Sequence, residues 1–438
     1  MDQIVTTNAH VKSAAVAVKV IKKLTPISVS PSHLIDLTAT IGEELAKQRD
    51  RQAAQQVEGT LEVEVKQSPE TVAVGTDGGR IFTRAEEAGR GVHDPAWKET
   101  KIACLTTYSS QPSAVDPHPE LPGCFADKDG VGKLVREVKS IRNEAGDRAA
   151  SDGKDEGADT VAEVENLLES LVLPAETADE ETREQQPAER KIKAKQKKKK
   201  NDWRPQRRVR TCVSSMCSSD EFGPKVAAEA HRRGFFQASR RAFLGDGLAW
   251  NWTLHARWFP DFVPILDFVH PTTYVYEASR VVAGDQEQGW PLCERWLQAC
   301  WEGDVSSVLA ELRNWQRLHP SPPDEKLAET DGRAIVSRAV RYLSNNACRM
   351  DYPSYRRMGL PVTSSMVESL IKEFNYRVKG SEKSWKRPSG CEPILQVRNA
   401  VLCEDADRLS DFILSRPGSA YYRPSTSKRA SEATAVAA

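Results

Sequence analysis

Residues Phe243 to His270 read FLGDGLAWNWTLHARWFPDFVPILDFVH. One apolar run ends at Asp246, an amphipathic segment follows over 248–259, and a second apolar run ends at Asp267. The pattern predicts a strand, an acid, a helix, a second strand and a second acid. This order is typical of an open α/β sheet, in which the site forms at the carboxyl ends of the strands.

Two glycines, Gly245 and Gly247, flank Asp246. Without a Cβ on either side of the acid, a ligand or another backbone segment can approach closely. An equally simple interpretation is that Asp246 caps the helix that follows through its backbone amides. Both interpretations stand on local sequence alone.

The length of 438 residues fits two or three domains, and the hydrophobic content of 39% indicates that part of the chain does not fold. A formal net charge of zero conceals a strong local asymmetry. Residues 143–190 contain fifteen acids and four bases, whereas 191–210 contain eleven bases and one acid. We expect this acidic-then-basic block to be a mostly disordered insertion, with a basic run that either neutralises phosphates or stays solvated.

The chain has no run of eighteen apolar residues, and its first residues lack the pattern of a secretion signal. Its nine cysteines are scattered, without the spacing of a zinc site. These features predict a cytoplasmic protein with no membrane partner and with free thiols.

A second acid-bearing segment, residues 71–83, reads TVAVGTDGGRIFT. The pattern predicts a buried strand that ends at Asp77, an Asp-Gly-Gly hairpin turn, and a second strand through Thr83. Residues 101–107 predict a third strand, and the alternation over 60–66 predicts an edge strand. The alternative role for Asp77 is that of an ordinary turn aspartate.

Residues 359–385 contain a third candidate acid, Glu368. Ser365 followed by Glu368 matches a capping box, which is the simplest role for this glutamate at the start of a helix over 365–378. Residues 372–387 then contain six bases and two acids, interleaved with three aromatic residues. Bases with interspersed aromatics suit a phosphate backbone and its flanking bases.

Three blocks together, 74–79, 245–247 with 267–270, and 359–385, resemble the DDE transposases of bacterial insertion sequences, in the Kra-type group allied to the Mutator-like elements. The resemblance extends from about residue 30 to about residue 415. It implies an α/β fold, a ribonuclease-H-like mixed sheet with a helical subdomain inserted between the second and third catalytic acids. It also implies that Asp77, Asp246 and Glu368 are the catalytic acids, with Asp267 and His270 as an accessory pair.

The same resemblance implies two Mg²⁺ ions, for which Mn²⁺ can substitute, held by Asp77, Asp246 and Glu368. Its implied partner is double-stranded DNA, both element ends and target, bound by a homo-oligomer. The residues expected to bind nucleic acid are Lys372, Arg377, Lys379, Lys383, Trp385 and Lys386. The implied function is transposition by phosphodiester cleavage and strand transfer. Related proteins usually have more sequence before the sheet, including an amino-terminal DNA-binding region, so a truncated copy is one expectation. The alternatives to an active transposase are a catalytically silent DNA-binding remnant and a nuclease with no mobile-element role.

The sequence pattern and the resemblance divide the chain into seven parts. The expected parts are a helical N-terminal segment (1–57), the first part of the catalytic domain (58–142), the disordered insertion (143–208), the second part of the catalytic domain (209–284), a helical insertion (285–358), the catalytic C-terminal helix with its basic region (359–415) and a disordered tail (416–438).

Overall fold

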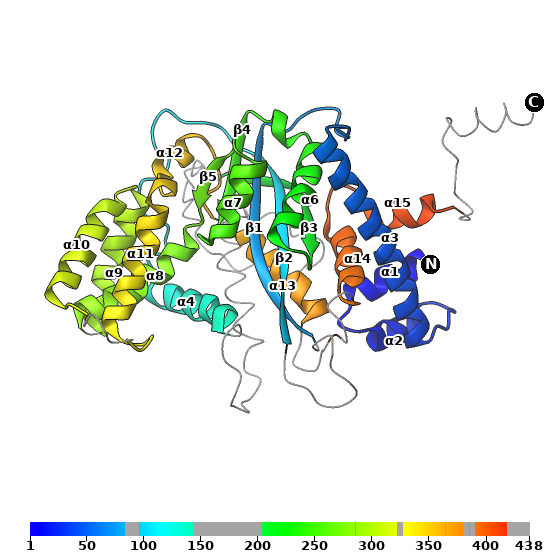
Figure 1. Cartoon of the computed structure of the whole chain (residues 1–438), viewed down its shortest axis with the longest axis horizontal. Coiled ribbons are helices and arrows are strands. Elements are labelled where there is room, and N and C mark those ends of the chain that lie inside the picture. Colours follow the sequence, from blue (N-terminus) through cyan, green and yellow to red (C-terminus); the bar gives the residue numbers. More distant parts are fainter. Residues whose placement is uncertain are drawn as a thin grey trace, which may run out of the picture.

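The computed structural model describes residues 1–83, 96–143, 204–284, 286–321, 327–363, 365–379, 385 and 390–417. Within these ranges the side chains at 96–97, 139–143, 286–287, 365–366 and 368 are not described. Most of the expected insertion over 143–208 and of the expected tail over 416–438 therefore lies outside the described residues. Figure 1 shows a central sheet with a helical layer on one side and the N-terminal helices on the other.

The sheet has five strands in the order β3-β2-β1-β4-β5. Strands β1, β2 and β3 are antiparallel, whereas β1, β4 and β5 are parallel. The expected α/β class with a mixed sheet is thereby confirmed. The strand bounds are β1 Thr71–Thr83, β2 Ala96–Ser109, β3 Gln206–Ser215, β4 Arg240–Gly245 and β5 Val263–Leu266.

The predicted Asp-Gly-Gly hairpin is wrong, because β1 continues through Asp77, Gly78 and Gly79 without a turn. Its register with β2 is unbroken from Thr71 opposite Tyr108 to Thr83 opposite Ala96. A tight hairpin turn needs positive φ at its central residues, and neither glycine has one. These glycines lie in an extended strand, so Asp77 is a mid-strand residue and not a turn aspartate.

Helix α13 (Ser365–Val378) lies against β1, and Gly75 permits this close packing. A Cβ at Gly75 would collide with the Cγ2 atom of Val367 in α13. Further along the strand, a Cβ at Gly79 would lie 3.8 Å from Oδ1 of Asn375 in the same helix. The helix therefore follows β1 along the segment that contains Asp77.

We expect Gly75→Ala to destabilise the fold by about 1–3 kcal/mol, the usual cost of overpacking a core. The added methyl group must displace Val367, which is only 4% exposed. The midpoint of urea unfolding measures this effect. Gly123→Ala is the control, because a Cβ there would meet nothing within 4 Å. Equal midpoints for both variants would show that α13 is not seated on β1 in this way.

Helices cover both faces of the sheet. Helices α6 (Ser219–Arg232) and α7 (Ala249–Trp258) pack on one face, through a core that contains Val74 and Phe243. Helices α13 and α14 (Glu392–Leu402) pack on the other face, through a core that contains Ile102 and Leu395. Because side chains alternate along a strand, consecutive residues of β1 face different helices.

A layer of helices lies beside β5, at that edge of the sheet (Figure 1). Its core joins buried residues of β4 and β5 to side chains such as Trp296, Trp301 and Leu343. The part of the layer after β5 begins with α8 at Val269, ahead of the boundary expected at residue 285. The helices of the layer are α4 Lys128–Asn143, which precedes β3, and α8 Val269–Ala283, α9 Gln286–Trp301, α10 Val305–Leu318, α11 Gly332–Asn346 and α12 Tyr352–Arg357, with a 3₁₀ turn at Ala347–Arg349 after α11. A second 3₁₀ turn, Phe235–Gln237, lies before β4 and packs in the core with α6 and α7.

The N-terminal helices α1 (Asp2–His10), α2 (Ala14–Leu24) and α3 (Pro31–Glu58) pack beside α14 and α15 (Arg408–Ser415). Arg49 of α3 ties this group to the sheet, because its guanidinium donates to Glu392 at 2.5 Å and to the Ser214 carbonyl at 3.1 Å. No described helix is long and apolar enough to cross a membrane.

The edge strand predicted over residues 60–66 is also wrong, since this segment has no strand structure. Its alternating residues do not alternate in burial: Val63 is 39% exposed and Val65 is 37% exposed. An ion pair fixes the segment instead: the Glu64 carboxylate lies 2.6 Å from the Arg232 guanidinium. Period-two alternation predicts a strand only where one face finds a core.

Candidate active site

Three acids occupy the same level of three neighbouring parallel strands. Thr76 pairs with Gly245, and Gly245 pairs with Leu266, so the next residue on each strand is Asp77, Asp246 or Asp267. The amide of Asp267 extends the ladder by donating to the Gly245 carbonyl at 3.1 Å. Neighbouring strands lie about 4.8 Å apart, so the fold places the three residues side by side.

Asp246 follows β4 directly and is only 8% exposed. Its Oδ1 atom accepts two hydrogen bonds, from the Leu248 amide at 2.9 Å and from the Asn251 side chain at 2.7 Å. The first bond closes a local turn ahead of α7, whose N-cap is Leu248 and has no side-chain capping bond, so Asp246 does not cap the helix as the alternative interpretation expected. The second is a bond between side chains. Together they fix the orientation of the carboxylate at the end of the strand.

Asn251 of α7 connects the first two strands of the row. Its Nδ2 donates to Asp246, while its Oδ1 accepts the Thr76 hydroxyl at 2.8 Å. Asn251 is fully buried, so both bonds are shielded from water. Since Thr76 precedes Asp77, this amide holds Asp246 in a fixed relation to the strand that carries Asp77.

The helical layer reaches the same point through Tyr342 of α11. The Tyr342 hydroxyl donates to the Asp246 carbonyl at 2.7 Å, and its ring stacks on Tyr274 with centroids 3.9 Å apart. Gly247 lies against this ring with φ of 95°, and a Cβ there would come within 2.7 Å of Cε2. Both the left-handed conformation and the ring require glycine after Asp246.

Asp267 and His270 form a pair, as the Asp-x-x-His spacing at the start of α8 suggests. The His270 Nε2 atom lies 3.6 Å from Oδ2 of Asp267, which is fully buried. Oδ1 of Asp267 accepts the Val269 amide at 3.2 Å. Beside this pair, the Tyr352 hydroxyl donates to the Leu266 carbonyl at 2.9 Å, and burial raises the pKa of Tyr352 well above its usual value.

Asp77 and α13 lie on the same face of the sheet. Side chains on β1 alternate, so Asp77 points to the same side as Gly75, which faces Val367. Its Oδ1 accepts the amide of Gly78 at 2.6 Å. Glu368 directly follows Val367 in α13, although its side chain lies outside the described residues, as does that of its expected cap, Ser365.

Of the residues expected to bind nucleic acid, Arg377 is built into the fold. Arg377 is 7% exposed, its guanidinium donates to the Asn8 carbonyl at 3.1 Å, and burial lowers the pKa of this group. This placement argues against a DNA contact. The basic, aromatic-rich pattern did not reveal the burial, because α1, which covers this arginine, is remote in sequence.

The other expected nucleic-acid residues differ in their surroundings. Lys372 pairs with Glu137 of α4 at 2.6 Å, and the half-buried Trp385 donates its indole N–H to the Val378 carbonyl at 2.9 Å. Lys379 lies just beyond the end of α13 and is partly exposed. Lys383 and Lys386 lie outside the described residues.

The donors at this site suit a hard divalent cation. Asp77 and Asp246 offer carboxylate oxygens from adjacent strands, which are the ligands that Mg²⁺ prefers. Among the described side chains, which exclude that of Glu368, no cluster of three histidine, cysteine, aspartate or glutamate groups could hold a metal ion. Glu368, the third ligand that the resemblance implies, belongs to α13, but its side chain lies outside the described residues.

Sequence reasoning missed Asn251 and Tyr342. Asn251 lies within the stretch over 243–270, where a polar residue on the inner side of an amphipathic helix is the one available signal. Tyr342 has no local signal, because its contact with Asp246 joins residues far apart in the chain.

Comparisons with known proteins leave the family open. The chain matches no protein-family model and no curated protein sequence. Its activity must therefore be inferred from the row of acids on β1, β4 and β5 and from the helix that faces them.

Proposed function

We propose that the chain is a metal-dependent nuclease and strand-transfer enzyme of the DDE transposase type, built on a ribonuclease-H-like sheet. One observation carries the proposal: Asp77 and Asp246 stand side by side on parallel strands, with α13 packed over Asp77. The sheet order, with β1 central and antiparallel to β2, supports the same proposal.

Phosphodiester cleavage requires a nucleophile in line with the leaving 3′ oxygen and neutralisation of the charge on phosphorus. When bound, a pair of Mg²⁺ ions supplies the Lewis acidity for both requirements. In this chain Asp77, Asp246 and Glu368 would hold the ions. Asn251 and the Leu248 amide hold the Asp246 carboxylate in one orientation, so the site is organised before substrate binds.

The proposed reaction has two steps on DNA. In the first step the oxygen of a water molecule forms a bond to phosphorus and the water loses a proton, while the bond from phosphorus to the 3′ oxygen breaks and that oxygen gains a proton. In the second step the freed 3′ hydroxyl attacks a phosphodiester of the target duplex in the same manner. No covalent enzyme intermediate forms, because the nucleophile in each step, water or the 3′ hydroxyl, attacks phosphorus directly.

Nicking of supercoiled plasmid by the purified chain tests this proposal. We expect relaxed circles to accumulate with Mg²⁺ or Mn²⁺ and not with EDTA. A chain that binds DNA but never nicks it under these conditions would be the silent remnant. Joining of a labelled 3′ end to the plasmid then distinguishes a transposase from a simple nuclease.

Replacing Asn251 by Ala should reduce the nicking rate about 10–100-fold, as removal of a residue that orients a metal ligand usually does. The concentration of Mg²⁺ that gives the half-maximal rate should rise, because Oδ1 of Asp246 then has one donor in place of two. Thr76→Val, which removes only the far bond of the bridge, should have a smaller effect of the same kind.

Thr253→Val is the matched control for this experiment. Thr253 lies on the same helix, and its hydroxyl bonds only to the Ala249 carbonyl on an exposed face. It should leave both the rate and the Mg²⁺ requirement unchanged. If Asn251→Ala slows nicking with no change in the Mg²⁺ requirement, Asn251 does not act through the ligand.

A further inference from the structure

Helix α2 and the residues directly before it carry four positive charges and no negative charge. Between Asp2 and Asp36 the chain has no aspartate or glutamate, yet it has four lysines, Lys12, Lys19, Lys22 and Lys23. All four lie on α2 or directly before it. In a chain with equal numbers of acids and bases, such a segment has a strong local potential.

Packing of α2 turns these lysines outward. The opposite side of the helix is buried through Ala14, Ala17 and Ile21, which pack against Leu34 of α3. Ser13 caps the helix by accepting the Val16 amide at 3.3 Å. The helix is therefore fixed to the protein by its apolar face, and Lys12, Lys19, Lys22 and Lys23 are exposed.

None of these four ammonium groups forms an ion pair within the described part of the chain. Elsewhere, lysines of the sheet and its helices do have acidic partners: Lys101 pairs with Glu99, and Lys225 pairs with Asp50. The charge of α2 is thus not neutralised by described neighbours and is directed at solvent.

The position of α2 connects it with the active-site side of the molecule. Figure 1 shows α2 toward the same end of the molecule as the carboxyl end of β1. A cavity of about 290 Å³ is lined by Lys12 and Ser13 on one side and by Arg377 and Trp385 on the other. The lysine face therefore begins at Lys12, across this cavity from Arg377 and Trp385.

We propose that the face formed by Lys12, Lys19, Lys22 and Lys23 binds the phosphate backbone of a DNA duplex that extends away from the active site. The proposal rests on the proposed function, and it names where the flanking duplex lies. Four exposed cations along a fixed helix complement a polyanion, and phosphate contacts of this kind position DNA without reading its sequence. An anionic membrane is the weaker fit, because a membrane-surface helix inserts a broad apolar face, whereas Ala14, Ala17 and Ile21 of α2 are buried and, of its large apolar residues, only Val16 and Leu24 are exposed.

Fluorescence anisotropy with a labelled DNA duplex tests the proposal on the full chain. Ca²⁺ replaces Mg²⁺ in this experiment, so that binding is measured without cleavage. Replacing the four lysines by Gln should weaken binding about tenfold or more at 0.1 M salt. The slope of log K against log salt should become shallower by about 3 to 4, roughly one unit for each phosphate that is no longer neutralised. Replacing the same four by Arg keeps the charge and should leave both quantities nearly unchanged.

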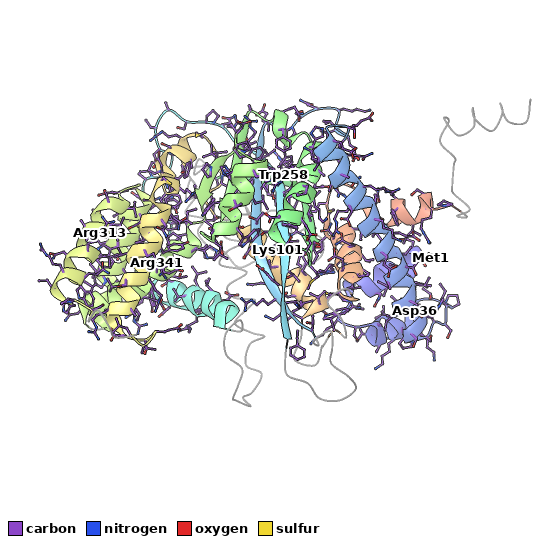
Figure 2. All side chains as sticks on the ribbon, viewed as in Figure 1. Met1, Asp36, Lys101, Trp258, Arg313 and Arg341 are labelled. Atoms are coloured by element: carbon purple, nitrogen blue, oxygen red, sulfur yellow. The ribbon has the colours of Figure 1, made fainter. Side chains whose placement is uncertain are left out.

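A matched set on the helical layer, Arg313, Arg317, Arg338 and Arg341 changed to Gln, removes the same charge from the far end of the molecule. Figure 2 labels Arg313 and Arg341 at the end opposite Met1. We expect a much smaller decrease in affinity from this set. An equal or larger decrease would overturn the proposal that α2 is the specific surface.

Two other outcomes separate the inference from the function. If the Gln set of α2 binds duplex DNA as tightly as the wild type while the wild type nicks plasmid, the inference fails and the function stands. If the wild type neither binds nor nicks DNA, the function itself fails. Lysine-dependent binding to vesicles that contain phosphatidylserine, without binding to DNA, would assign α2 to a membrane surface instead.

Discussion

Asp77→Asn is expected to reduce Mg²⁺-dependent nicking by orders of magnitude while the fold and DNA binding persist. The change removes the negative charge that a metal ligand requires but keeps the shape of the side chain. The amide oxygen of Asn can still accept the Gly78 amide, which Asp77 Oδ1 accepts at 2.6 Å. Plasmid relaxation measures the rate, and thermal unfolding measures the stability.

Asp36→Asn is the control for Asp77→Asn. Asp36 is exposed on α3, far from the row of acids, and Figure 2 labels it on the N-terminal side of the molecule. It should nick at the wild-type rate. If Asp77→Asn nicks at the wild-type rate, Asp77 is not a metal ligand, and the nicking activity depends on other residues.

Glu368→Gln is expected to have a comparably large effect on nicking. The variant should fold and bind DNA, because glutamine replaces glutamate in a capping box with a stability change below about 1 kcal/mol. If Glu368 supplies only a cap, activity should survive together with this small change. Measuring the nicking rate beside the free energy of unfolding therefore distinguishes a metal ligand from a helix cap.

Glu373→Gln provides the comparison within the same helix. The Glu373 carboxylate pairs with Arg210 of β3 at 2.8 Å, so it already has a structural role on the far strand of the sheet. We expect this variant to be somewhat less stable and to keep nicking. If Glu373→Gln abolishes nicking and Glu368→Gln does not, the third acid is Glu373.

Several elements were predictable from local sequence because their signals are local. The helix expected over 365–378 matches the observed α13, and the N-terminal segment that was expected to be helical contains α1, α2 and α3. The acids at Asp246 and Asp267 do follow strands, since an apolar run followed by a helix signal marks such a junction. Periodicity and capping residues act within a few positions, so a sequence displays them directly.

The course of β1 and the contacts around its acid were not predictable in this way. The Asp-Gly-Gly segment has the composition of a turn, but pairing with β2 along its whole length and the close approach of α13 keep it extended. Likewise Arg377 belongs by composition to a basic surface, yet α1 buries it.

Local sequence was therefore enough to show that Asp246 and Asp267 follow strands, where α13 begins, and that the N-terminal segment is helical. Folding in three dimensions puts Asp77 at the same level as those two acids, makes Asn251 a bridge between two strands, and brings Tyr342 to Asp246. The reason is physical: local propensity depends on neighbours in the chain, whereas register and buried hydrogen bonds depend on segments that meet only after folding.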